Sequence, residues 1–94
     1  MFILTPTAAI LESGQTNPHP MTSPDYHEGT FEKLDTLSIR LRDDDGAVYF
    51  TGRMTRKALM DSPEHIAFAP LDRTSNSYGC TELQYFQGGT WETL

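Results

Sequence analysis

One alternating segment constrains the fold of this chain more than any other. From residue 37 to residue 42, leucine and isoleucine alternate with serine and arginine, a period of two that is typical of a half-buried β-strand. The dipeptide Asp45-Gly46 follows, and it is a preferred two-residue hairpin turn. Residues 47–53 then resume a strand pattern. The segment therefore predicts an antiparallel β-hairpin.

The turn also predicts the register of this hairpin. With a two-residue loop, the apolar residues face one another in the pairs Leu41–Phe50, Ile39–Gly52 and Leu37–Met54. The pairs on the opposite face are Arg42–Tyr49, Arg40–Thr51 and Ser38–Arg53. A slip of one residue would place leucines beside arginines, so the register is well specified.

The beginning of the chain is compatible with two structures. In the first, which we favour, Thr5 caps a short helix that has Pro6 at its first position and runs to Ser13. In the second, residues 2–4 and 8–11 are short strands. Residues 14–30 hold three of the six prolines and little core material, so we expect a Pro-rich connector, flexible or laid flat over the domain.

Weaker patterns follow the first hairpin. Residues 55–62 are compatible with one or two helical turns. Residues 62–70 carry both a helix start and an alternation of Ile66 and Phe68 with alanines, and we predict a strand over 65–70. We expect a polar loop over 72–79.

A second hairpin is predicted at the end of the chain. Residues 80–87 and 90–94 flank Gly88-Gly89, another two-residue turn signal. In this register Phe86 lies opposite Trp91, and Leu83 lies opposite Leu94 on the other face. We therefore expect this hairpin to be covered on both sides, for instance by the N-terminal segment.

These elements predict a single domain over residues 1–94, since 94 residues leave no room for a second. The expected class is mainly β or α+β, with about five antiparallel strands in a meander, curled sheet or small barrel, with or without a short N-terminal helix. The single cysteine excludes an internal disulfide. No cationic start precedes a long apolar run, so we expect a cytoplasmic protein with no membrane partner.

The net charge of −6 is distributed unevenly along the chain. Residues 1–37 and 61–94 each carry −4, whereas residues 38–60 carry +2. Nucleic-acid-binding domains are usually basic throughout, so this balance makes a nucleic-acid partner less favoured than a protein partner. A solubility role is the simplest explanation of the acidic charge.

No catalytic or metal-binding pattern emerges from the residue spacings. Asp43, Asp44 and Asp45 are consecutive, whereas calcium loops need acids at alternate positions, so we predict no metal and no cofactor. Cys80 with His65 or His27 could form a thiol–base pair, but only the presence of these residues suggests it, so a small hydrolase or thiol enzyme ranks last. A chain this short also has difficulty enclosing a pocket of ~300 Å³.

The polar face of the first hairpin is the candidate site. Arginine forks bind carboxylates and phosphates, and tyrosine is frequent in interface hot spots. The predicted partner-binding residues are Arg40, Arg42, Asp43, Asp44, Asp45, Tyr49 and Arg53. The competing interpretation is that the arginines only pair with neighbouring side chains of the sheet.

These observations give a leading function and an alternative. The leading hypothesis is a non-enzymatic module that binds a larger protein or ribonucleoprotein complex and inhibits nucleic-acid processing, with the three aspartates in a site that normally holds phosphates. The alternative is a small-barrel nucleic-acid-binding module that also uses Arg56 and Lys57. The sequence does not indicate an oligomeric state.

Two stretches also carry a resemblance. LRDDDGAVYFTGRM and FAPLDRTSNSYGCTELQYFQGGTWETL, which together make up about half the chain, are similar to small uncharacterised proteins of phages and other mobile elements. In size and charge the chain also resembles phage inhibitors of bacterial defence, such as anti-CRISPR proteins. The resemblance implies an inhibitor acting in the host cytoplasm, and it assigns no functional residues.

Overall fold

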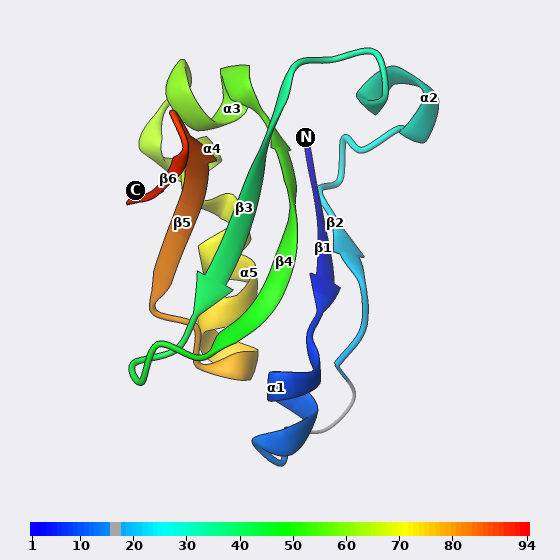
Figure 1. The fold of residues 1–94 in the computed structure, drawn as a ribbon. Coiled ribbons are helices and arrows are strands. Elements are labelled where there is room, and N and C mark those ends of the chain that lie inside the picture. The colour runs from blue at the N-terminus through cyan, green and yellow to red at the C-terminus, as the bar shows by residue number, and fades with distance from the viewer. Residues whose placement is uncertain (16–17) are drawn as a thin grey trace.

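The chain folds as an α+β domain built on one antiparallel sheet. The computed structural model describes residues 1–15 and 18–94, and there six strands lie in the order β2-β1-β4-β3-β5-β6 (Figure 1). The strands are β1 (Phe2–Pro6), β2 (Met21–Thr22), β3 (Thr36–Arg42), β4 (Val48–Thr55), β5 (Glu82–Gln87) and β6 (Thr90–Thr93). The helices are α1 (Ala8–Glu12), α2 (Glu28–Phe31), α3 (Arg56–Met60), α4 (Glu64–Ala67) and α5 (Ala69–Tyr78).

The predicted α+β class is confirmed, but the meander and the barrel are wrong. In a meander each strand pairs with the next along the chain, whereas here β3 pairs with β5 and β1 pairs with β4. The three helices α3 to α5 connect β4 to β5, and α5 lies behind the sheet (Figure 1). The sheet stays open, with β2 and β6 at its edges.

The first hairpin forms with five of its six predicted pairs. Leu41 lies opposite Phe50, and the register holds to Leu37 and Met54 at the far end. The predicted Arg42–Tyr49 pair is wrong, because Arg42 lies opposite Val48. A bulge separates this pair from the Leu41–Phe50 pair. Tyr49 is the extra residue, and it is buried at 8% exposure.

The bulge results from the turn. The Gly46 N–H bonds to the Asp43 carbonyl, Gly46 has a φ of 83°, and the Asp43 N–H bonds to the carbonyl of Ala47. This is a three-residue loop with glycine in the left-handed region, instead of the two-residue loop expected. The extra loop residue would shift every strand pair beyond the turn by one residue. The bulge at Tyr49 compensates for this shift and restores the register that buries the leucines.

The N-terminal segment combines the two structures expected for it. Residues 2–6 are strand, as in the second alternative, and Ala8–Glu12 is helix, as in the first. The favoured helix start at Thr5 is therefore wrong, and so is a strand over 8–11. Residues 14–30, predicted as a connector, contain β2, which pairs with β1, and they end within α2; residues 16 and 17 lie outside the described structure.

The strand predicted over 65–70 and the loop over 72–79 are both wrong. Glu64–Ala67 and Ala69–Tyr78 are helices, and Pro70 lies in the first turn of α5, where its missing N–H costs nothing. The buried residues of α5 are Pro70, Thr74 and Tyr78, spaced by four, and Gly79 ends the helix in the left-handed region. The predicted helical turns at 55–62 are confirmed as α3.

The core lies between the sheet and the helices. It joins Phe2 and Leu4 of β1 to the apolar residues of β3 and β4. The ring of Phe50, with 0% exposure, meets the ring of Tyr78 edge-on at 5.2 Å and so connects the sheet to α5. In the described part of the chain, no helix is long and apolar enough to cross a membrane.

Candidate interaction surface

One face of the sheet carries the sequence-predicted arginines. The burial pattern of β3 alternates, with Leu37, Ile39 and Leu41 in the core and the residues between them exposed or half-buried. The strand register then places further side chains on the same face as these intervening residues. We call this side the open face, and its central residues are Arg40, Arg42, Arg53, Glu82, Gln84, Phe86, Trp91 and Thr93.

An ordered cluster lies on the open face across β3, β5 and β6. The Arg40 Nε donates to Gln84 Oε1 at 2.7 Å, and Gln84 Nε2 donates to Thr93 Oγ1 at 3.2 Å. The Arg40 guanidinium lies 4.2 Å from the centre of the Trp91 ring. Phe86 meets that ring edge-on at 5.3 Å and is itself 41% exposed. We call these five residues the Arg40–Trp91 cluster.

The other two arginines of the open face are also held in place. Arg42 Nε pairs with Glu82 Oε1 at 2.7 Å, and both side chains are about 30% exposed. Arg53 donates to Thr36 Oγ1, and its guanidinium lies 5.3 Å from the centre of the Phe31 ring. The central open face thus carries three arginines against one glutamate in a chain whose net charge is −6.

The acidic triplet divides into a structural member and two exposed ones. Asp43 Oδ1 accepts hydrogen bonds from the backbone N–H groups of Asp45 and Ala47, at 3.0 and 2.8 Å. The bond from Ala47 is the main cause that lowers the pKa of Asp43. The side chains of Asp44 and Asp45 are exposed at the hairpin tip. Asp43 therefore stabilises the turn, and only Asp44 and Asp45 remain free for a partner.

The structure keeps part of the predicted site together. Arg40, Arg42 and Arg53 share the open face as predicted, whereas Tyr49 points into the core because of the bulge. A hydrogen bond from Ser13 lowers the pKa of Tyr49, but the effects of Asp43 and of burial outweigh it and raise the pKa overall. Arg56 and Lys57 lie on α3, beyond the end of β4.

Sequence reasoning missed Gln84, Phe86 and Trp91. The register of the second hairpin is confirmed, since Phe86 faces Trp91 and the Leu94 N–H bonds to the Leu83 carbonyl. The expected cover on both faces is wrong for Phe86, whose side is open. Only the pairing of β5 with β3 brings these aromatic residues beside Arg40, and no local pattern signals that pairing.

The candidate thiol, Cys80, lies in the hydrophobic core. Cys80 is 1% exposed, and burial is the main cause that raises the pKa of its thiol, the opposite of what activates a nucleophile. The His27 ring accepts the Thr30 N–H at 3.2 Å and caps α2. Within residues 1–15 and 18–94, no three histidine, cysteine or acidic side chains come together as metal ligands.

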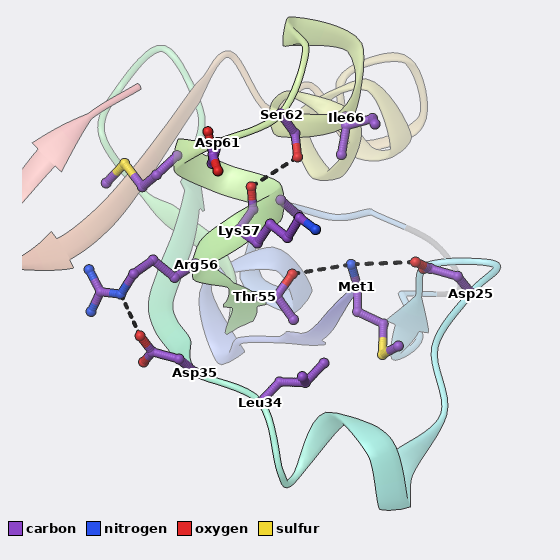
Figure 2. A pocket seen from close by; sticks show the side chains of 12 residues that line it. Met1, Asp25, Leu34, Asp35, Thr55, Arg56, Lys57, Asp61, Ser62 and Ile66 are labelled. Atoms are coloured by element: carbon purple, nitrogen blue, oxygen red, sulfur yellow. Dashed lines mark hydrogen bonds and ion pairs between the residues drawn. The ribbon is translucent and has the colours of Figure 1, made fainter.

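A cleft of about 750 Å³ opens at the end of the sheet next to α3 (Figure 2). Three exposed apolar side chains, Leu34, Met60 and Ile66, line it. Arg56 bonds to Asp35 at 2.7 Å on one side. Across the cleft, the Met1 amine lies 3.7 Å from Asp25. Ion pairs thus flank an apolar wall.

Comparison with known proteins adds no family to this picture. No protein-family model, no curated protein and no solved structure matches the chain.

Proposed function

We propose that this chain is a non-enzymatic protein-interaction module that binds its partner through the open face of the sheet. The observation that carries the proposal is the Arg40–Trp91 cluster, in which a guanidinium lies 4.2 Å from the centre of a half-buried tryptophan ring. Tryptophan and arginine are, with tyrosine, the residues enriched in interface hot spots.

The order of the cluster supports binding. Arg40 is fixed by Gln84 on one side and by Trp91 on another, so little side-chain freedom remains to be lost when a partner docks. The exposed ring of Phe86 extends the apolar part of the patch. Arg42 and Glu82 form a charged rim beside it, a layout in which rim charges steer the partner and the centre supplies most of the affinity.

The more specific form of the proposal concerns the partner. We propose a nucleic-acid-processing protein complex that the chain inhibits, with Asp44 and Asp45 entering a site that otherwise holds phosphates. Their exposure at the tip of the β3–β4 hairpin supports this form, because the tip extends beyond the body of the sheet (Figure 1).

Affinity capture with matched variants tests the general proposal. The tagged chain, a Trp91→Ala variant and a Leu11→Ala variant are each incubated with lysate of the native cell, and the captured proteins are identified by mass spectrometry. Leu11 is 63% exposed on α1, outside the strands β3, β5 and β6 that carry the Arg40–Trp91 cluster, so it controls for loss of an apolar side chain. We expect one protein partner that wild type and Leu11→Ala retain and Trp91→Ala loses.

A labelled oligonucleotide is the competing arm of this experiment. A fluorescence-anisotropy titration at low salt should stay flat if the partner is a protein. Salt-sensitive oligonucleotide binding that Trp91→Ala abolishes would instead establish the nucleic-acid-binding alternative and overturn the proposal.

Charge reversal at the tip tests the inhibitor form separately. The double variant Asp44→Lys/Asp45→Lys should bind the captured complex more than tenfold more weakly, because two carboxylates that replace phosphates become cations. Asp43 is left intact, since its carboxylate holds the turn. Unchanged affinity would remove phosphate mimicry and leave the open-face proposal standing.

A further inference from the structure

The outer edge of β6 has backbone groups that the sheet does not use. β6 is the last strand on its side of the sheet (Figure 1). The Leu94 N–H donates to the Leu83 carbonyl at 3.0 Å, and bonded and non-bonded pairs alternate along an antiparallel ladder. In the observed register, the N–H and C=O groups of Trp91 and Thr93 therefore point away from β5.

We propose that this edge accepts an extended, basic peptide segment of a protein partner as a seventh, antiparallel strand. The inference rests on the protein-interaction function proposed above and names how that partner docks. The backbone groups of Trp91 and Thr93 would supply the hydrogen bonds. Of the devices that commonly block an exposed edge, β6 contains no proline, lysine or bulge; it is four residues long, and its one charged side chain is Glu92.

The charge of Glu92 indicates which kind of segment would pair with the edge of β6. Glu92 lies between the two outward-pointing residues and is exposed, so it faces the central residue of an added strand. A lysine or arginine at that position would form a favourable cross-strand pair. In a second copy of this chain paired through Trp91 and Thr93, Glu92 would instead face another Glu92, and like charges directly opposite each other are destabilising. The edge therefore favours a basic segment over self-association.

The neighbouring positions of the added strand would face the open face. Trp91 and Thr93 both point to that side, and Trp91 already stacks with Arg40. An apolar or aromatic residue opposite Trp91 would extend this stack. The preferred segment is therefore a basic residue flanked by apolar or β-branched residues, which places the docked strand beside the Arg40–Trp91 cluster.

Nuclear magnetic resonance on the full chain tests the edge directly. The probe is a blocked seven-residue peptide of alternating valine and threonine with a central lysine, and the matched control has glutamate at the centre. We expect the amide signals of Trp91 and Thr93 to shift and to gain protection from exchange, while those of Glu92 and Leu94 change little. The glutamate peptide should bind at least fivefold more weakly.

Three variants make the test decisive. Thr93→Pro removes an outward N–H and should weaken lysine-peptide binding at least tenfold, whereas Thr93→Val keeps that N–H and should stay within twofold. Glu92→Lys should reverse the preference between the two peptides without touching the backbone. Equal binding of both peptides, or Trp91 and Thr93 amides already protected in a dimer of the free chain, would overturn the proposal.

Partner capture separates this proposal from the proposed function. If Thr93→Pro retains the captured partner while Trp91→Ala loses it, then the edge inference fails and the open-face function stands. If the partner is retained by both variants, the open-face function fails as well.

Discussion

Replacing Phe50 with alanine is expected to lower the free energy of unfolding by about 3–5 kcal/mol, the cost of deleting a fully buried phenylalanine. The Phe50 ring is 0% exposed and lies between the sheet and α5, where it contacts Tyr78. A domain of this size has a total stability of roughly 5–14 kcal/mol, so the variant loses a large share of it. Urea denaturation followed by circular dichroism measures the change.

Phe86 provides the matched control for this prediction. It is the same residue type on another strand of the sheet, β5, but it is 41% exposed on the open face. Phe86→Ala should cost about 1 kcal/mol or less, since substitutions at the surface usually have small effects. Equal losses for the two variants would mean that the core and open faces of the sheet are wrongly assigned.

Replacing Gly52 with alanine is expected to destabilise the fold by about 3 kcal/mol, at the upper end of the cost of over-packing. A methyl group at Gly52 would lie 1.9 Å from the Ile3 carbonyl oxygen and 3.1 Å from the Leu4 Cα. Both neighbours are backbone atoms of β1, which cannot rotate away. β1 must therefore move off β4, and the ladder that ties the N-terminus to the sheet weakens.

The same substitution at Gly29 should not lower the stability of the fold. Gly29 lies in α2, and a methyl group there would approach only the His27 side chain, at 3.4 Å. Alanine is a better helix former than glycine by up to about 1 kcal/mol, so Gly29→Ala should be neutral or stabilising. Thermal melts of both variants, with hydrogen exchange at β1, distinguish the two outcomes. A Gly52→Ala variant as stable as wild type would contradict the close approach of β1 to β4.

The sequence predicted the elements whose contacts are local. Both hairpins were predictable because in each of them the paired side chains are joined by a short turn. The predicted register holds from Leu41–Phe50 to Leu37–Met54 in the first hairpin and at Phe86–Trp91 in the second. The pairings of β1 with β4 and of β3 with β5 were not, because those strands are about 40 residues or more apart and no local pattern specifies their neighbours.

Helix α5 was missed for a different reason. Its buried face consists of Pro70, Thr74 and Tyr78, only one of which is a large apolar side chain, so hydrophobic periodicity does not reveal it. The signals that were present are Pro70 in the first turn and Gly79 at the end, and these helix-boundary residues could have identified it.

In the candidate site, too, the sequence predicted what depends on local strand geometry and missed what depends on long-range pairing. Alternation along β3 predicted that Arg40 and Arg42 share a face, because that depends only on strand geometry. The position of Tyr49 could not be predicted, since two turn types fit the sequence and only one needs a bulge. Trp91 joins Arg40 through the long-range β3–β5 pairing, so the centre of the open face emerges only from the fold.

The measurement that tests the central proposal most directly is isothermal titration calorimetry of the captured partner with wild type, Trp91→Ala and Leu11→Ala. Loss of a hot-spot tryptophan costs at least about 2 kcal/mol, so Trp91→Ala should bind roughly 30-fold more weakly or worse, while Leu11→Ala binds like wild type. A partner bound equally well by all three proteins would contradict the assignment of the open face as the interaction surface.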